Sequence, residues 1–139
     1  MLLFEDELVG VMTFGFHPRK SSMLVLDRLC FKDDVSIAGG ASRLFKFLLK
    51  NTNTSEIVSW SENRWSQGDV YKQLGFSLDA DLSPDYTYYD HKKRLVLSKQ
   101  SQKKSLTKCP KGKTEHEWAS ERGLCRIWDC GKKRWKYKT

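Results

Sequence analysis

Residues 36–49 decide the fold of this chain, and they read Ser36-Ile-Ala-Gly-Gly-Ala-Ser-Arg-Leu-Phe-Lys-Phe-Leu-Leu49. After two glycines, apolar residues recur at positions i, i+3, i+4, i+7 and i+8, which is the spacing of one face of an amphipathic helix. These apolar residues are Ala41, Leu44, Phe45, Leu48 and Leu49. The stretch therefore predicts a helix that begins near Gly39-Gly40 and packs one face on a core.

Apolar runs on both sides of this helix have the character of strands. The predicted elements are strands over Leu8–Phe14, Ser22–Phe31 and Glu56–Ser61 and a short helix over Gln67–Leu74. Both alternating sides of residues 22–31 are apolar, as in a central strand covered on both faces. Gly75 suits the left-handed stop of the short helix. Alternating strands and helices indicate the α/β class, with an antiparallel hairpin over residues 87–97 completing the sheet.

Basic charge is concentrated in the last third of the chain. The whole chain has 25 Lys and Arg against 17 Asp and Glu, and residues 91–139 hold 16 of the basic residues and 4 of the acidic ones. A basic stretch that also contains Trp and Tyr is typical of a surface that binds nucleic acid. We therefore predict a core domain over residues 1–98, a basic linker over 99–113 and a basic tail over 114–139, with DNA as the main partner.

The tail is predicted to consist of a helix and a hairpin. Thr114 and Glu117 have the spacing of a capping box, and Gly123 can end the helix that follows. A hairpin would place alternate side chains of residues 126–137 on one face, where cations mix with flat rings. The candidate nucleic-acid-binding residues are Lys103, Lys104, Arg126, Trp128, Lys132, Lys133, Arg134, Trp135, Lys136 and Tyr137. The alternative for the aromatic residues is a place in the small core of the tail.

The glycines before the first helix offer a second kind of site. Glycine backbone at a helix N-terminus lets phosphate oxygens approach free N–H groups, although a plain glycine-rich helix start is the alternative. The order of elements resembles the GNAT acyltransferase fold, an α/β (α+β) fold with a mixed, mostly antiparallel sheet flanked by helices. Ser36-x-x-Gly39-x-Ala41 is similar to the acyl-CoA loop of that family, with its first residue changed. The resemblance implies acyl-CoA as a cofactor, held by residues Ser36, Ile37, Ala38, Gly39, Gly40 and Ala41.

The same resemblance implies two catalytic residues. Tyr71-Lys-Gln-Leu-Gly-Phe76 looks like the family's Tyr-x-x-Leu-Gly-Phe, in which the tyrosine donates a proton to the departing thiolate. Packing of the ring on the sheet is the alternative role. Asp27 lies about where GNAT enzymes place a general base, and burial in the strand is expected to suit it to that role. A structural ion pair at Asp27 is the alternative, with the base then supplied by residues 62–64.

A narrower resemblance covers nearly the whole chain. Blocks at residues 8–15, 39–46, 71–76, 84–88 and 126–131 are similar, in order, to phage-encoded homing-endonuclease-type proteins of the Hef or Vsr-like group. Their C-terminal region carries a GNAT-like domain related to the Mom DNA-modification proteins. The resemblance implies a DNA-binding module in a phage-infected bacterial host, with an upstream nuclease domain or a separate nuclease chain as partner.

Two other functions remain open, because no nuclease motif is visible in this sequence. One is a GNAT/Mom-like acyltransferase that uses a CoA-type donor to modify nucleic acid or protein. The other is a phage protein that binds host machinery and keeps only the fold, since a fold by itself does not choose a function.

Composition argues against several further classes of protein. No apolar run approaches the ~18–20 residues that span a bilayer, and a secretory signal is not visible, so a cytoplasmic protein without membrane insertion is expected. Four cysteines are too few for a disulfide scaffold. Free cysteines are favoured over a zinc site at Cys109, His116, Cys125 and Cys130, which lack a Cys-x-x-Cys pair, and no metal is predicted.

Overall fold

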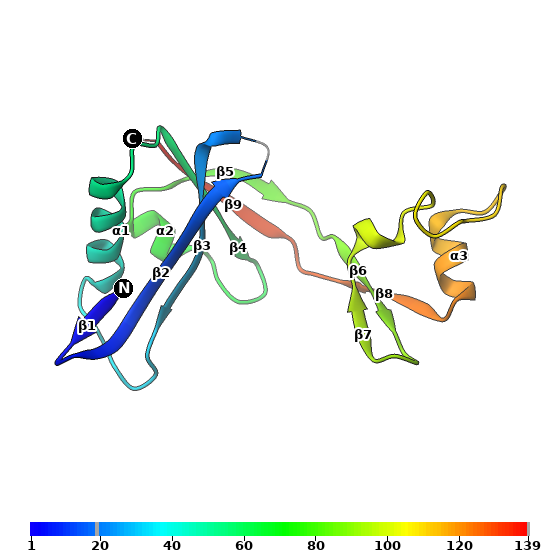
Figure 1. Cartoon of the computed structure of the whole chain (residues 1–139), viewed down its shortest axis with the longest axis horizontal. Helices are drawn as coiled ribbons and strands as arrows, with labels where there is room; N and C mark the ends of the chain where they lie inside the picture. Colours follow the sequence, from blue (N-terminus) through cyan, green and yellow to red (C-terminus); the bar gives the residue numbers. More distant parts are fainter. Residues whose placement is uncertain (19, 139) are drawn as a thin grey trace. The chain divides into compact units, whose positions relative to one another are not determined.

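The structure is a computed structural model that describes residues 1–18 and 20–138. The chain divides into two compact units, whose elements are labelled in Figure 1. Unit 1 combines residues 1–82 with the C-terminal segment from Lys132, and unit 2 consists of Ser83–Gly131. Unit 2 is therefore an insertion in the sequence of unit 1.

In the described part of the chain, unit 1 is built on a six-stranded sheet with the order β1-β2-β3-β4-β9-β5. Its strands are β1 (Leu2–Phe4), β2 (Glu7–His17), β3 (Lys20–Phe31), β4 (Glu56–Glu62), β5 (Ser77–Leu82) and β9 (Lys132–Lys138). Neighbouring strands are antiparallel except β3 and β4, which are parallel. The sheet is thus mixed and mostly antiparallel, which confirms this part of the predicted fold class.

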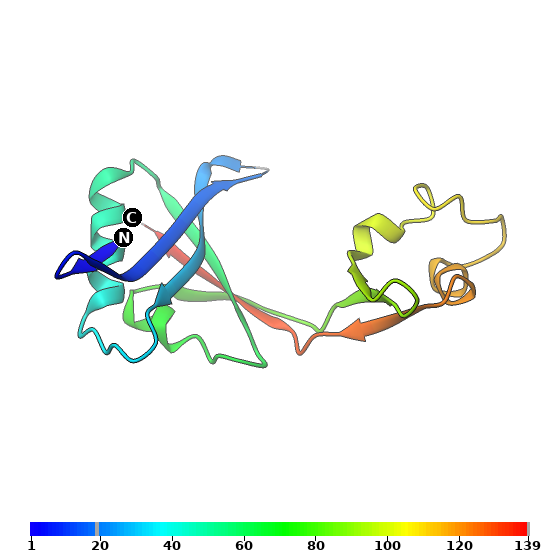
Figure 2. The ribbon, with the colours of Figure 1, turned by 60° about the horizontal axis from the view of Figure 1, so that its bottom comes forward.

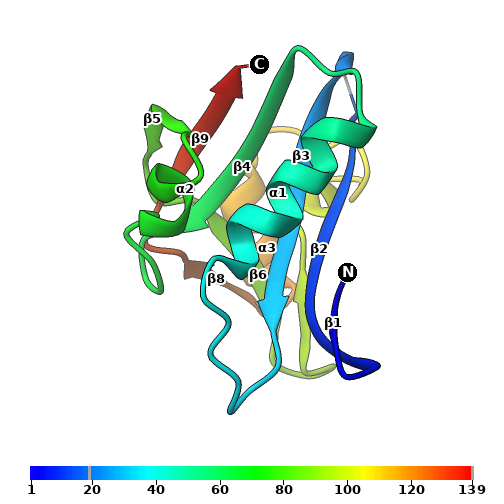
Figure 3. The ribbon, with the colours of Figure 1, turned by 90° about the vertical axis from the view of Figure 1, so that its left-hand side faces the viewer.

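Helices α1 (Gly40–Asn51) and α2 (Asp69–Gln73) lie on one face of this sheet (Figure 3). α1 connects β3 to β4, because parallel neighbours need a crossover connection. It buries Leu44, Phe45 and Leu48, as its periodicity predicts. α2 is shorter than predicted, and Gly75 with φ 86° follows its end as expected.

The main core of unit 1 lies between these helices and the sheet. Its buried members are Leu24, Leu26, Phe45, Leu48, Ile57, Leu74, Phe76 and Trp135. Each fully buried side chain of this size stabilises the fold by about 1.5–3 kcal/mol relative to exposure. The rings of Phe45, Phe76 and Tyr137 contact one another with centroids 5.0–5.5 Å apart. The helix-facing side of the sheet is therefore closed by aromatic packing around β9.

β9 contradicts the hairpin predicted over residues 126–137. It pairs antiparallel with β4 on one side and with β5 on the other, and not with the preceding strand. Its cations meet carboxylates of those two neighbours, in the pairs Lys132–Glu62, Arg134–Asp79 and Lys136–Glu56. The sequence of β9 predicts a basic face exposed to solvent, but in the sheet its cations pair with carboxylates. These carboxylates lie in distant parts of the sequence, so the pairing is not visible from β9 itself.

Unit 2 is built on an antiparallel sheet with the order β7-β6-β8. Its elements are β6 (Tyr86–Asp90), β7 (Leu95–Leu97), the 3-10 helix η1 (Lys99–Gln102), α3 (Glu115–Glu121) and β8 (Leu124–Trp128), and Figure 2 shows them from a second side. Tyr88, Ala119 and Leu124 form its core. The predicted β6–β7 hairpin and the capping box of Thr114 and Glu117 are both present. No helix among residues 1–18 and 20–138 has the length and apolar character needed to cross a bilayer.

These units differ from the predicted ranges 1–98, 99–113 and 114–139. The hairpin of β6 and β7 belongs to unit 2 rather than to the first domain. The segment predicted as a linker is also held in place, since Trp118 Nε1 donates to the carbonyl oxygen of Thr107 at 3.0 Å and Arg122 Nη2 donates to Gln102 Oε1 at 3.0 Å. The polar composition of this segment did not indicate these contacts, because they are made by a backbone carbonyl group and by the buried Gln102.

Candidate functional site

The parallel ladder of β3 and β4 is short. It pairs Met23 with Glu56, Leu24 with Ile57 and Val25 with Val58, whereas β3 continues to Phe31 and β4 to Glu62. Figure 3 shows the two strands separating beyond this point. The backbone groups of residues 27–31 and 60–62 on these facing edges are therefore not joined in the described ladder, so the sheet can accept an amide-containing chain there.

Ser59 and Tyr71 meet at the point where the ladder ends. Ser59 is buried, and its Oγ donates to the carbonyl oxygen of Leu26 at 2.7 Å, which links β4 to β3 directly after the last paired residues. Tyr71 Oη lies 2.9 Å from that Oγ and donates to the carbonyl oxygen of Trp60 at 3.2 Å. A phenol hydroxyl is thus aimed at the opening between the strands, and it can donate or accept a proton.

Packing holds the ring of Tyr71 in this position. The ring stacks on Trp135 with centroids 5.7 Å apart and an interplanar angle of 17°, and it meets Phe76 edge-on at 5.6 Å. Trp135 is in turn fixed by a hydrogen bond from Nε1 to Ser61 Oγ at 2.8 Å. The ring of Tyr71 therefore packs on the sheet, as one of its two predicted roles requires, while its hydroxyl reaches the ladder end, where the role of proton donor stays a prediction.

The N-terminus of α1 is open to an anion. Gly39 is its N-cap with φ 69°, no side chain caps the helix, and the first turn contains no acidic residue. A Cβ at Gly39 would meet no atom within 4 Å, so the space beside this backbone is free. Uncapped N–H groups and the positive end of the helix dipole favour phosphate oxygens. The residues here fit a phosphate-bearing ligand such as CoA.

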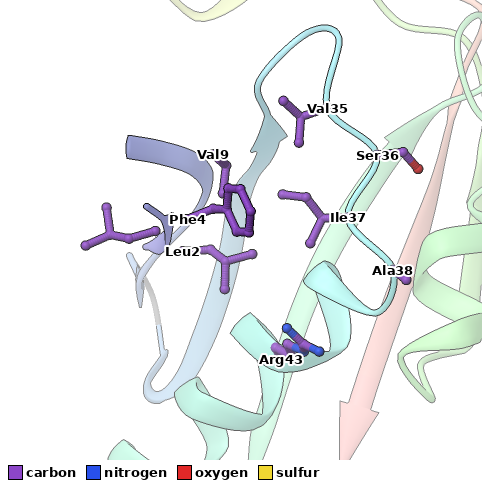
Figure 4. A pocket seen from close by; sticks show the side chains of 9 residues that line it. Leu2, Phe4, Val9, Val35, Ser36, Ile37, Ala38 and Arg43 are labelled. Carbon is purple, nitrogen blue, oxygen red and sulfur yellow. The ribbon is translucent and has the colours of Figure 1, made fainter. Parts of the chain in front are cut away.

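The loop before α1 has two different sides. Figure 4 shows Val35 and Ile37 pointing into a pocket while Ser36 and Ala38 point away from it. The pocket measures about 470 Å³, and it is lined by Leu2, Leu3, Phe4, Val9, Val35, Ser36, Ile37, Ala38 and Arg43. Successive side chains of the predicted cofactor loop thus point to opposite sides. Val35 and Ile37 hold the loop through apolar contacts on one side, and Ser36 and Ala38 can face a ligand on the other.

Asp27 lies next to the ladder end but not as predicted. Its neighbour Leu26 points into the helix-side core, so the carboxylate of Asp27 lies on the opposite face of the sheet. Asp27 is exposed, and the burial expected for a general base is therefore wrong. Asp27 and Tyr71 therefore lie near the ladder end on opposite faces of the sheet.

The predicted nucleic-acid-binding residues do not share a face. Trp135 is 2% exposed and Tyr137 packs on Phe45, so their placement on an exposed binding face is wrong. Lys132, Lys133, Arg134 and Lys136 lie on β9 within unit 1. In unit 2, Lys103 and Lys104 are exposed, and Arg126 and Trp128 both contact the ring of Tyr86. Only the unit 2 residues lie outside the main sheet of unit 1.

No disulfide joins the four cysteines, all of which lie among the described residues, and they do not gather around a metal. Among the residues that the structure describes, no three His, Cys, Asp or Glu side chains converge as ligands. Cys125 instead lies beside His91, with Sγ 3.2 Å from Nε2. Cys109 Sγ lies 3.6–3.9 Å from the carbonyl oxygens of three residues, Pro110, Lys113 and Thr114.

Sequence reasoning missed the two serines of β4. Ile57, Ser59 and Ser61 alternate along one face of the strand, and that face is buried. Small hydroxyl residues at inward positions of a buried strand are the signal that could have found them, since a buried hydroxyl needs a hydrogen-bond partner. Ser59 and Ser61 hydrogen-bond to Tyr71 and Trp135 and so help to fix these two rings.

No protein-family model and no curated protein matches this sequence. A similar solved structure is a crystal structure of an acetyltransferase from Bacillus subtilis in complex with CoA. The similarity has a TM-score of 0.56 with 16% sequence identity, and it covers 99% of this chain and 73% of that chain. The likeness shows the fold alone: this chain has a GNAT-like mixed α+β fold, which confirms the predicted fold class.

Proposed function

We propose that unit 1 binds an acyl-CoA thioester and transfers its acyl group to an acceptor, with Tyr71 as general acid. The observation that carries this proposal is the position of the Tyr71 hydroxyl at the end of the β3–β4 ladder, 2.9 Å from Ser59 Oγ. The acetyltransferase of similar fold was crystallised with CoA, which is consistent with this ligand class.

Three features of the chain would hold such a ligand. The N-terminus of α1 would bind the phosphates through the N–H groups of its first turn that follow Gly40, since the Gly40 N–H already donates to the carbonyl oxygen of Ile37 at 3.1 Å, and Gly39 leaves space for the phosphate oxygens. The unpaired edges of β3 and β4 would bind the amide groups of the pantetheine arm. Tyr71 would then lie where the thioester sulfur is expected, at the ladder end.

In this reaction the side chains of the protein would transfer protons. A bound thioester supplies an activated acyl group and a thiolate as the leaving group. Tyr71 would protonate that thiolate, because a phenol can donate its proton to sulfur as the bond breaks. Asp27 lies on the opposite face of the sheet, where it would accept a proton from an acceptor arriving from that side.

Calorimetric titration of the full chain with CoA tests the binding half of the proposal. We expect binding by the unmodified chain and its loss in Gly39→Asp, because a carboxylate would stand where phosphate oxygens approach. Gly112→Asp is the matched control, since Gly112 also has a positive φ, 87°, and no atom within 4 Å of a Cβ, but lies in unit 2. Equal CoA binding by the two variants would contradict the site, and no binding by the unmodified chain would contradict the ligand.

A second function, nucleic-acid binding by unit 2, rests on a separate observation. Residues 91–114 contain nine Lys and Arg and no Asp or Glu, and most of these side chains are exposed. This charge supports nucleic-acid binding by unit 2, whereas the phage homing-endonuclease-type protein and its nuclease domain or chain as partner stay what the sequence resemblance implies. Lysines that contact phosphates supply affinity independent of base sequence.

Charge reversal in the full chain tests this second function. The Lys103→Glu/Lys104→Glu variant should weaken binding to duplex DNA and flatten its dependence on salt, because fewer counterions are released. The matched control is Lys46→Glu/Lys50→Glu, which makes the same charge change on α1 of unit 1. Equal weakening by both variants would show that only net charge matters and would contradict a site on unit 2.

A further inference from the structure

The sheet of unit 2 has one face that its core does not use. Tyr88 and Leu97 are direct register partners and face the core around Ala119. The next residues along, Tyr89 and Val96, therefore point to the other face. Cys125 is the partner of Tyr89 on β8, so these three residues form one row across the sheet. The strands of this sheet, β7, β6 and β8, are labelled in Figure 1.

This outer face is open around the thiol. Val96 in the same row is 65% exposed, and Ile127, two residues beyond Cys125 on the same face, is 47% exposed. Cys125 itself is partly exposed. A small molecule in solution can thus reach Sγ, and the neighbouring side chains give it apolar surface to rest on.

His91 is held beside Cys125 as a hydrogen-bond partner. Its Nε2 lies 3.2 Å from Sγ, and its ring meets Tyr89 edge-on with centroids 4.9 Å apart. The turn that carries His91 is fixed by Asp90, whose Oδ1 accepts from the backbone N–H groups of Lys92 and Lys93 at 3.0 and 3.1 Å. A nucleophile with a base within hydrogen-bond reach is the arrangement of an activated thiol, and the ring contact with Tyr89 helps to hold that base in place.

We propose that Cys125 is a nucleophilic thiol served by His91, and that it exchanges with small-molecule disulfides to form a mixed disulfide. Sγ attacks one sulfur of RS–SR while its proton passes to Nε2 of His91. The S–S bond breaks, and the departing sulfur takes the proton from His91 to leave as RSH. The disulfide supplies the oxidising equivalent, and the product carries SR on Cys125.

The other cysteines of unit 2 and unit 1 serve as internal references. Cys109 Sγ lies beside three backbone carbonyl oxygens, whereas Cys125 Sγ lies beside the imidazole of His91. Cys30 is exposed on β3, so access alone cannot make Cys125 the faster thiol. Cys125 is not part of a disulfide, so its thiol is available for the reaction.

Peptide mapping of the full chain tests the proposal. The chain is treated with oxidised glutathione at pH 7, quenched over a time course and digested with trypsin, which places each of the four cysteines on its own peptide. We expect the Cys125 peptide to gain glutathione about tenfold faster than the Cys30 peptide, since a base beside the thiol takes its proton as the sulfur attacks. His91→Ala should bring Cys125 down to the rate of Cys30.

Two control variants distinguish loss of the base at His91 from general effects of mutation on the reaction rate at Cys125. His116→Ala removes another exposed histidine of unit 2 and should leave the rate at Cys125 unchanged. His91→Gln keeps a side chain of similar length in the turn and should still slow Cys125. Reaction of Cys125 no faster than Cys30 in the unmodified chain would overturn the proposal without any variant, and an unchanged rate in a folded His91→Ala chain would overturn the role of His91.

Discussion

Leu82 and Lys132 are direct register partners across β5 and β9, although the whole of unit 2 lies between them in the sequence. The two ends of the insertion are therefore adjacent in the sheet of unit 1, at the spacing of paired antiparallel residues. The sheet order places β9 between β4 and β5, so unit 1 needs its C-terminal strand to close the core.

The first prediction concerns this insertion. Replacing residues 83–131 by Asn-Gly should leave unit 1 folded, because a two-residue turn is the natural link between paired antiparallel ends. Circular dichroism and a cooperative thermal transition measure the outcome. A chain cut after residue 82 is the control and should not fold, since it lacks β9 and the buried ring of Trp135. A folded truncated chain, or an unfolded Asn-Gly chain, would contradict the two-unit organisation.

The second prediction compares two glycines that begin helices of unit 1. Gly39 and Gly68 are both left-handed N-caps, with φ 69° and 80°. A Cβ at Gly68 would lie 2.1 Å from Trp135 Cζ2, whereas one at Gly39 meets nothing. Gly39→Ala should cost about 1 kcal/mol of unfolding free energy from backbone strain, and Gly68→Ala about 1–3 kcal/mol more from overpacking. Urea unfolding followed by tryptophan fluorescence measures both, and equal losses would contradict the packing of Trp135 under Gly68.

The third prediction concerns the hydroxyl of Tyr71. Tyr71→Phe keeps the ring that stacks on Trp135, so CoA affinity should stay within about twofold, while acyl transfer should fall about 100-fold, as for loss of a general acid. Release of CoA from acetyl-CoA, measured by chromatography over a panel of amine acceptors, gives the rate. Tyr137→Phe removes a core hydroxyl from β9 and is the control. Transfer that is unaffected by Tyr71→Phe would rule out the proposed acid.

The fourth prediction is a pH dependence at the start of α3. Hydrogen bonds from the backbone N–H and the hydroxyl of Thr114 hold the pKa of Glu117 below its ordinary value. A lowered folded-state pKa means that the carboxylate stabilises α3 above the unfolded pKa and loses this effect as the pH falls through the folded one. Amide exchange over residues 115–122 should thus be faster in Glu117→Gln than in the unmodified chain at neutral pH. The difference should vanish in acid, and a constant difference would contradict the charge effect.

Local signals in the sequence predicted the elements that depend on local physics. The apolar spacing around Leu44 and Leu48 predicted α1, the Thr114 and Glu117 pair predicted the start of α3, and Gly75 marked the end of α2. Each of these rests on residues within one or two turns of chain. The same holds for Gly39 and Gly40, which lie at the start of α1 as predicted, while cofactor binding by this loop stays a proposal.

The pairing of strands that are far apart in the sequence could not be predicted from the sequence alone. β9 reads as a basic, aromatic hairpin strand, because the carboxylates of Glu56, Glu62 and Asp79 that match its cations lie in other segments. For this reason the sequence predicts that Trp135 binds nucleic acid, whereas its side chain is buried in the core of unit 1. The candidate site was predicted only in part. A sequence motif predicted Tyr71, whereas Ser59 is recognised only from its hydrogen bonds in the sheet.

Hydrogen–deuterium exchange of the full chain with and without CoA tests the central claim most directly, because it reports where the ligand binds. The account predicts slower exchange at the start of α1, residues 40–43, and along the unpaired edges of β3 and β4 at residues 27–31 and 60–62, with α3 of unit 2 unchanged. Binding that protects unit 2 while leaving these three segments of unit 1 unchanged would contradict it.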